Sequence, residues 1–157
     1  MRSDAMKKGV ERLPHRALLR ACGLSDEDLE KPLIGIANSW NQAIPGHVHM
    51  MELYERIAEG IRDEGGVPLA FGVPSICDGI AMNVEMRYSL PSRELIADSI
   101  EAVVLSHSYD GWVGLTNCDK ITPGMLIAAG RLDIPAIIVT GGPMRAGGLG
   151  DERLDVI

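Results

Sequence analysis

Four short apolar segments, each followed by small or polar residues, constrain the fold more than any other feature of this sequence. They are residues 32–39, 67–74, 111–116 and 135–140. Continuous apolar runs of this length are typical of parallel strands that are buried on both faces. Because parallel strands need crossover connections, we expect an α/β fold with three layers, α/β/α, and a mostly parallel sheet of about four strands.

Helical patterns lie between these apolar runs. The predicted helices are residues 47–63, 91–107 and 124–132. We expect Pro91 to begin the second of these helices and the Thr122 hydroxyl to cap the third. Residues 80–90 are rich in methionine and are predicted to be a loop.

The chain is predicted to have three parts. Residues 1–31 form an N-terminal arm and helices, including a helix over residues 14–22 and a short helix that Ser25 caps. Residues 32–144 form the α/β domain, which carries part of an active site. Residues 145–157 are expected to be a linker or the truncated start of a further segment.

Composition and charge argue against several classes of protein. With 157 residues and 46% hydrophobic content, the chain is long enough to bury one core. A net charge of −7 argues against nucleic-acid binding, because proteins that bind the phosphate backbone usually carry a basic face. The sequence shows neither a membrane segment nor an apolar signal region, so we expect a cytoplasmic protein.

Polar side chains follow three of the predicted strands. They are Asn38, Ser39, Asn41, Cys77, Asp78, Asn117, Cys118, Asp119 and Lys120. The carboxyl ends of parallel strands meet at one edge of the sheet, so we expect these groups to share a rim. Carboxylates are ligands of the kind that Mg²⁺ takes, and thiolates are ligands of the kind that an iron–sulfur cluster takes.

Each of these candidates also has an ordinary structural interpretation. Asp78 and Asp119 are equally well explained as turn residues or helix caps, and Lys120 as a solvated charge or, if desolvated, a base. Cys118 lies in a turn beside two charged groups, which favours a metal ligand or a reactive thiol over a core residue. For Cys77 the two interpretations are evenly balanced. Three cysteines without a CxxC pair suit reduced thiols or metal ligands better than disulfides.

The remaining chemical candidates have structural interpretations. Cys22 lies on a predicted helix face and is expected to be a small buried residue. His47 and His49 lie two positions apart at a helix start, so they face different ways, and we expect one at the rim and one in the core. Residues 141–143 are predicted to form a tight turn, because they lack the spacing of a P-loop or a dinucleotide-binding turn.

Several longer motifs are spread along almost the whole chain. They are RSD near the start, GIANSWN (35–41), PGHVH (45–49), CDGIAM (77–82), YSLPSRELIADS (88–99), NCDKITPGM (117–125) and TGGPM (140–144). Each motif alone is weak, but the combination is specific. Because of this combination of motifs, the chain resembles the amino-terminal part of the dihydroxy-acid dehydratase family, which also includes sugar-acid dehydratases such as phosphogluconate dehydratase.

The resemblance implies dehydration of a 2,3-dihydroxy carboxylic acid to a 2-oxo acid in valine, leucine and isoleucine biosynthesis. It also implies Mg²⁺ and an iron–sulfur cluster, of the 2Fe–2S or 4Fe–4S type, in which one iron is a Lewis acid for the departing 3-hydroxyl. By motif, Cys118 corresponds to a cluster ligand, and Asp78 and Asp119 correspond to Mg²⁺ ligands. Lys120 corresponds to a further Mg²⁺ ligand after carbamylation turns its amine into an oxygen donor.

The sequence departs from the family pattern in three ways. Many members carry a cluster cysteine where this chain has Gly46, so this ligand is either missing here or supplied by Cys77, which we favour. Residues 82–86 are one residue shorter than the usual glycine-containing loop. A further cluster cysteine, another metal-binding acid, the catalytic serine base and a β-rich C-terminal domain would lie beyond Ile157, so we expect the isolated chain to be inactive.

Two other functions remain open from the sequence. One is a fragment of a sugar-acid dehydratase, which residues 45–49 and 88–99 disfavour. The other is a non-catalytic, stand-alone domain that binds a small acid or a metal, or assists assembly. For the enzyme we expect a homodimer that acts on a small-molecule dihydroxy acid together with the missing C-terminal domain, without a nucleic-acid or membrane partner.

Overall fold

The computed structural model describes residues 1–155 and contains a four-stranded sheet. Its strands are, in spatial order, β2 (Val67–Gly72), β1 (Leu33–Asn38), β3 (Gly111–Thr116) and β4 (Ala136–Thr140). Every pair of neighbouring strands is parallel. The four apolar segments predicted to be strands are therefore the strands of this sheet.

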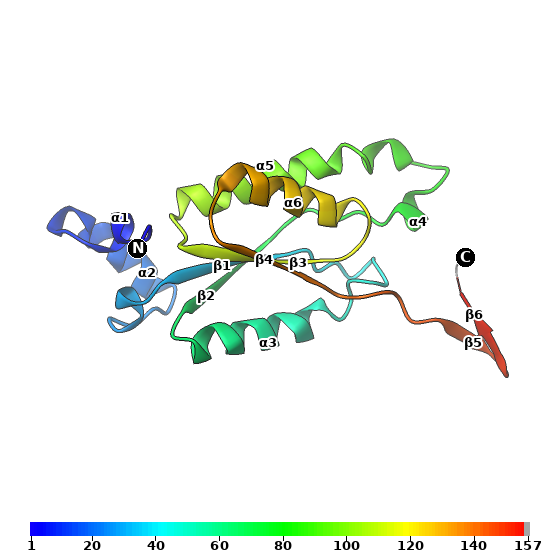
Figure 1. Cartoon of the computed structure of the whole chain (residues 1–157), viewed down its shortest axis with the longest axis horizontal. Coiled ribbons are helices and arrows are strands. Elements are labelled where there is room, and N and C mark those ends of the chain that lie inside the picture. Colours follow the sequence, from blue (N-terminus) through cyan, green and yellow to red (C-terminus); the bar gives the residue numbers. More distant parts are fainter. Residues whose placement is uncertain (156–157) are drawn as a thin grey trace.

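Helices cover both faces of the sheet, as Figure 1 shows. α3 (Met50–Asp63) lies on one face, and α5 (Ser92–Ser106) and α6 (Ile121–Leu132) lie on the other. Right-handed crossovers explain this distribution, because the connection from β1 to β2 runs one way along the sheet and the later connections run the other way. The predicted three-layer α/β/α fold is confirmed.

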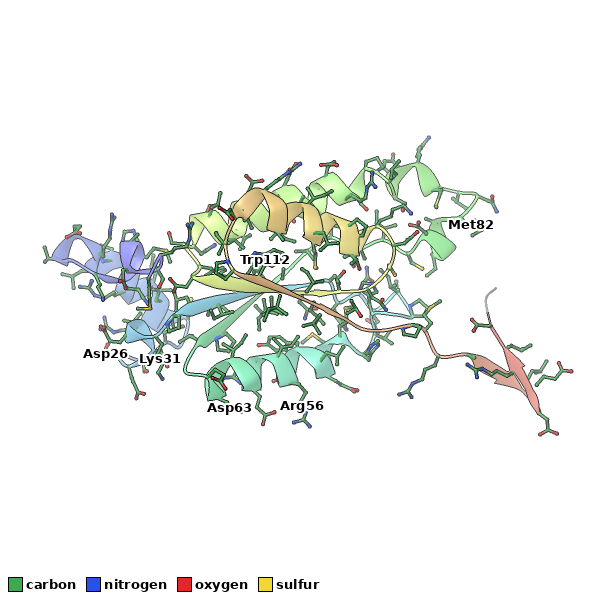
Figure 2. The ribbon with its side chains drawn as sticks, viewed as in Figure 1. Asp26, Lys31, Arg56, Asp63, Met82 and Trp112 are labelled. Atoms are coloured by element: carbon green, nitrogen blue, oxygen red, sulfur yellow. The ribbon has the colours of Figure 1, made fainter. Side chains whose placement is uncertain are left out.

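The core lies mainly between the sheet and the layer that α5 and α6 form. Ile96, Ile100 and Val104 recur along α5 and are fully buried. Trp112 of β3 is also buried, and Figure 2 shows it between the sheet and this helical layer. Gly124 lets α6 approach α5 closely, because a Cβ at this position would lie 3.0 Å from a backbone carbonyl oxygen of α5.

The N-terminal residues pack at the end of the sheet where β1 and β3 begin. They form α1 (Asp4–Lys7), η1 (Val10–Arg12), α2 (Leu13–Ala21) and η2 (Asp28–Glu30). The Asp110 carboxylate, just before β3, accepts hydrogen bonds from Ser3 N at 3.0 Å, Ser3 Oγ at 2.5 Å and Leu33 N at 2.9 Å. One side chain therefore joins the N-terminal arm to the beginnings of both strands.

Two predictions about the N-terminal part are corrected. Ser25 does not occupy the N-cap of the short helix, because η2 begins at Asp28 directly after Glu27, although the Ser25 hydroxyl accepts a hydrogen bond from Asp28 N at 3.1 Å. The predicted burial of Cys22 is wrong, since this residue is exposed. It follows α2, a helix whose residues are all at least partly exposed, so the helix does not carry the thiol into the core.

Two predictions about the middle of the chain are also corrected. Thr122 does not cap α6, because the helix already begins at Ile121, and the Thr122 hydroxyl instead lies 3.2 Å from Thr116 Oγ1. The segment predicted to be a methionine-rich loop contains two short helices. These are α4 (Asp78–Ala81) and η3 (Met86–Tyr88). Met82 lies between them and is exposed at the edge of the molecule in Figure 2.

The last described residues form an antiparallel hairpin of β5 (Gly147–Leu149) and β6 (Glu152–Leu154). All residues of both strands are exposed, and Figure 1 shows the hairpin away from the sheet. The predicted boundaries at residues 31 and 144 stay predictions, and residues 156 and 157 of the predicted third part lie outside the described residues. Of the helices within residues 1–155, none has the length and apolar character needed to cross a membrane.

Candidate functional site

The direction of the crossovers reverses between β1 and β3, and the predicted polar rim lies at this point. In open parallel sheets, ligands bind outside the carboxyl ends of the strands at such a reversal. Ser39, just after β1, donates its N–H and its hydroxyl to the Leu115 carbonyl at 3.1 and 2.8 Å. The Gly141 N–H, just after β4, donates to the Thr116 carbonyl at 2.9 Å. The ends of three neighbouring strands are thus held together.

Lys120 joins the two carboxylates that the family resemblance assigns to Mg²⁺. Its Nζ lies 2.8 Å from Asp78 Oδ2 and 2.8 Å from Asp119 Oδ2. Asp78 begins α4, whereas Asp119 and Lys120 lie in the turn between β3 and α6. The Asp78 side chain is 18% exposed and the Asp119 side chain is 70% exposed. The structure therefore brings the three groups together, with Asp78 as the inner carboxylate and Asp119 as the outer one.

Hydrogen bonds keep Asp78 and Lys120 charged at neutral pH. Burial by itself would raise the pKa of Asp78, but hydrogen bonds from Lys120 and Ser89 outweigh it, so the pKa is lowered. Hydrogen bonds to Asp119 and Asp78 raise the pKa of Lys120. Two carboxylates are thus aimed at one position, which the lysine ammonium occupies.

The donor chemistry of this cluster fits part of a Mg²⁺ site. Two carboxylates that converge on a cation are the hard oxygen ligands that Mg²⁺ takes. Lys120 adds an oxygen donor only after carbamylation, because an ammonium group has no lone pair to offer. Within residues 1–155, no three His, Cys, Asp or Glu side chains converge as a metal site. The metal-binding role of Asp78, Asp119 and Lys120 stays a prediction.

Ser89 belongs to this site but is not among the residues that the sequence predicts. Its hydroxyl donates a hydrogen bond to Asp78 Oδ1, and the residue is buried. The Ser92 hydroxyl donates to the Ser89 carbonyl at 2.6 Å, which holds the segment at the start of α5. A serine that lies 11 positions from Asp78, in a segment predicted to be a loop, carries no sequence signal of this contact.

Cys77 and Cys118, the predicted cluster ligands, are both half-buried and pack against the same core. Cys118 has a φ of 66°, in the left-handed region that residues other than glycine rarely adopt. Burial, and then electrostatic repulsion from neighbouring acidic groups, including Asp119 and Asp78, raises the pKa of Cys118 to about 11. The thiol is therefore protonated at neutral pH, and a bound cation would favour the thiolate. Two thiols at one rim fit part of an iron–sulfur site, and their role as ligands stays a prediction.

The two histidines have different environments, which confirms the prediction from their spacing. His47 is fully buried, and its Nδ1 donates to the Ser39 carbonyl at 2.7 Å. Burial lowers the pKa of His47, so the ring is neutral at pH 7. His49 is half-buried, and its Nε2 donates to the Gly141 carbonyl at 3.1 Å. His47 thus belongs to the core and His49 to the rim.

A cavity of about 920 Å³ opens beside the rim. It lies between the start of α3 and the residues that follow β4, and its lining includes His49, Cys77, Met144 and Arg145. A second cavity, of about 630 Å³, lies between α3 and the sheet and is lined almost entirely by apolar residues. The cavity beside the rim combines polar groups with a volume suited to a small organic ligand.

Comparison with known proteins identifies the family. The family described as "Dihydroxy-acid/6-phosphogluconate dehydratase N-terminal" matches residues 31–157. The dihydroxy-acid dehydratases of Pyrococcus abyssi and Aquifex aeolicus are each 60% identical over 157 residues, which are 99% of this chain and 28% of those proteins. That of Methanobrevibacter smithii is 55% identical over 100% of this chain and 29% of its own length. The chain thus spans less than a third of these relatives, and it belongs to the dihydroxy-acid/6-phosphogluconate dehydratase family, corresponding to the N-terminal part of its members.

Proposed function

We propose that this chain forms the N-terminal part of the active site of a hydro-lyase. The enzyme would dehydrate 2,3-dihydroxy carboxylic acids to 2-oxo acids in the biosynthesis of valine, leucine and isoleucine. The observation that carries the proposal is the rim of the sheet, where a lysine joins two carboxylates, each of which directly follows a cysteine in the chain. The names of the relatives support the substrate class.

The residues of the rim would divide the binding of two cofactors. Cys118 and Cys77 would hold an iron–sulfur cluster, and Asp78, Asp119 and carbamylated Lys120 would hold Mg²⁺. When bound, these groups would supply Lewis-acid chemistry for the departing 3-hydroxyl. The protein's contribution is to orient the donors before the cofactors bind, as the hydrogen bond from the buried Ser89 hydroxyl does for Asp78. The family resemblance places the serine base that removes the C2 proton outside these residues.

Cys77 is proposed to replace the cluster cysteine that many family members carry at the position of Gly46. A Cβ added to Gly46 would lie 2.9 Å from Nδ2 of Asn117, so the space beside Gly46 is already filled by this amide. Cys77 and Cys118 are both half-buried and pack against the same core. Both observations favour Cys77 as the second ligand in this chain.

A sugar-acid substrate is the alternative within the family, whose description also covers 6-phosphogluconate dehydratases. Relatives with 55 to 60% identity are named dihydroxy-acid dehydratases, which favours the branched-chain substrate class. Turnover rates measured under the same conditions with a 2,3-dihydroxy acid and with 6-phosphogluconate decide between the two substrate classes. Faster turnover of 6-phosphogluconate would overturn the branched-chain assignment.

Residues 1–157 by themselves are expected to be inactive. The described residues supply two thiols and two carboxylates but no converging set of three such groups, so the remaining donors would come from elsewhere in the protein. We also propose that the enzyme is a cytoplasmic homodimer. Size-exclusion chromatography with light scattering and cell fractionation test these two properties.

Anaerobic reconstitution of the intact protein with iron, sulfide and Mg²⁺ tests the proposed function. We expect bound iron and sulfide, and formation of a 2-oxo acid from a 2,3-dihydroxy acid. Cys118→Ser should reduce the iron content to background, whereas Cys22→Ser, at an exposed position, should keep the wild-type content. A folded wild-type protein that binds neither iron nor Mg²⁺ would instead favour a non-catalytic, stand-alone domain.

A further inference from the structure

Asn117 connects three loops at the rim. It directly follows β3, and its Nδ2 donates to the Gly46 carbonyl at 3.0 Å and to the Gly142 carbonyl at 2.7 Å. Gly46 lies between β1 and α3, and Gly142 follows β4. An amide group has two N–H donors, so both are used. The side chain therefore ties the end of β3 to the loops that follow the strands on either side of it.

Close packing surrounds these hydrogen bonds. A Cβ at Gly46 would lie 2.9 Å from Asn117 Nδ2, and a Cβ at Gly141 would lie 3.0 Å from His49 Nε2 and 3.3 Å from the Gly46 carbonyl oxygen. His49 also donates to the Gly141 carbonyl at 3.1 Å. The loops are thus in contact around the Asn117 amide. A substitution that removed the two N–H donors of this amide would leave the Gly46 and Gly142 carbonyls without this hydrogen-bond partner.

Cys118 directly follows this tie and is held in an unfavourable conformation. Its φ of 66° is left-handed, which costs free energy in a residue with a Cβ and persists only where the surroundings hold it. On the C-terminal side, its carbonyl accepts a hydrogen bond from Thr122 N at 3.3 Å in the first turn of α6. On the N-terminal side, the amide of Asn117 is anchored to two loops. The turn that presents the thiol is therefore fixed from both sides.

We propose that Asn117 is a positioning residue, which holds the Cys118 thiol in the orientation that a cluster iron requires. The cluster in this statement rests on the proposed function, whereas the control of the thiol's position by Asn117 does not. Asn117 thereby couples the geometry of the thiol to the loops after β1 and β4, both of which line the cavity beside the rim.

Three variants separate this role from general stability. Asn117→Asp has the same size but replaces both donors by a carboxylate that faces two carbonyl oxygens, and Asn117→Ala removes the donors without adding charge. Thr122→Val is the matched control. Valine has the same shape as threonine, so this variant removes only the hydroxyl that lies 3.2 Å from Thr116 Oγ1. It leaves the hydrogen bonds of Asn117 to the two loops unchanged.

Alkylation of the intact protein without iron reports how accessible the thiol is. Iodoacetamide labelling of each cysteine is followed by peptide mass spectrometry, with exposed Cys22 as the internal reference. In Asn117→Ala we expect Cys118 to react about tenfold faster relative to Cys22, since two hydrogen bonds of the turn are lost, and we expect Cys77 to react at the wild-type rate. Asn117→Asp should show a smaller acceleration, because its added negative charge disfavours the thiolate that reacts. An unchanged Cys118 rate in Asn117→Ala, or equal acceleration of Cys77 and Cys118, would overturn the inference.

The reconstituted protein provides a second readout. In the Asn117 variants we expect lower iron content and a changed electron paramagnetic resonance spectrum of the reduced cluster, while Thr122→Val keeps the wild-type spectrum. Far-ultraviolet circular dichroism checks that all variants are folded. Wild-type iron content and spectrum in both Asn117 variants would refute the positioning role. A wild-type protein that binds no iron would refute the proposed function, and the alkylation rates would still decide the role of Asn117.

Discussion

Asp110→Asn tests how the N-terminal arm is held to the sheet. The carboxylate accepts hydrogen bonds from Ser3 N on Oδ1 and from Ser3 Oγ and Leu33 N on Oδ2. Asparagine keeps only one oxygen. In either orientation of the amide, its NH₂ group faces one of the two backbone N–H groups and leaves that donor without its acceptor.

The expected cost follows from this geometry. A donor left unsatisfied away from water costs about 1–3 kcal/mol, and Ser3 is fully buried. The substitution also removes a negative charge that acts on Lys7, which is 3% exposed and donates to the Lys31 carbonyl at 2.6 Å. We expect Asp110→Asn to lower the free energy of unfolding by about 2–3 kcal/mol, which a domain with a typical stability of about 5–15 kcal/mol survives.

The pH dependence has a defined sign. Burial would raise the pKa of Asp110, but hydrogen bonds from Ser3 and Leu33 and the charge of Lys7 outweigh it, so the folded-state pKa lies below the unfolded value. The ionised carboxylate therefore stabilises the fold above the unfolded pKa of about 3.9, and this contribution is lost as the pH falls through the folded-state pKa. The difference between wild type and Asp110→Asn should be largest at neutral pH and shrink as the pH falls below the unfolded pKa towards the folded-state pKa.

Urea unfolding followed by tryptophan fluorescence measures this difference at several pH values. Asp63→Asn is the control, because it removes the same charge from an exposed position on α3 that Figure 2 shows at the surface. We expect the control to change stability by less than about 0.5 kcal/mol. An Asp110→Asn variant as stable as this control at neutral pH, or a difference that does not shrink in acid, would refute the anchoring role.

Three further predictions concern packing and the site. Gly124→Ala should lower the free energy of unfolding by about 1–3 kcal/mol, because the new Cβ would lie 3.0 Å from the backbone of α5. Gly130→Ala in the same helix should raise the free energy of unfolding by about 0.5–1 kcal/mol, because a Cβ there would meet no neighbouring element within 4 Å. Equal effects of the two substitutions in urea unfolding would contradict this packing. Ser89→Ala should weaken Mg²⁺ binding by the intact protein about tenfold in calorimetry, since the inner carboxylate loses the hydrogen bond that orients it, and unchanged affinity would remove Ser89 from the site. Cys118→Ser should abolish iron binding while Cys22→Ser retains it, and iron content at the wild-type level in the first variant would exclude Cys118 as a ligand.

The main elements of the sheet could be predicted because burial leaves a local signature in the sequence. The apolar run at residues 111–116 is buried along its whole length in β3, and the pattern of Ile96, Ile100 and Val104 marks the face of α5 that covers the sheet. Both patterns depend on residues only a few positions apart. Given the strand order, right-handed crossovers then fix the face of the sheet on which each connecting helix lies.

Local patterns were less informative about side chains whose environment depends on distant residues. Cys22 has the sequence context of a buried helix residue but is exposed, because α2 lies beyond the main layers. Thr122 has the spacing of a cap, yet α6 begins one residue earlier. The contacts of Asp110 with Ser3 span 107 positions, so no periodicity in the sequence reports them.

The sequence by itself determined the fold class, the family and the kinds of chemical group available at the strand ends, because these depend on residue type and short-range order. Only the tertiary structure decided which groups meet. It brought Asp78 from the start of α4 to Lys120 after β3, added Ser89 to that cluster, and joined Asn117 to the loops on both sides. The physical reason is that hydrogen bonds and charges act over a few ångströms in space, and only the packed layers bring residues from different strands within that distance.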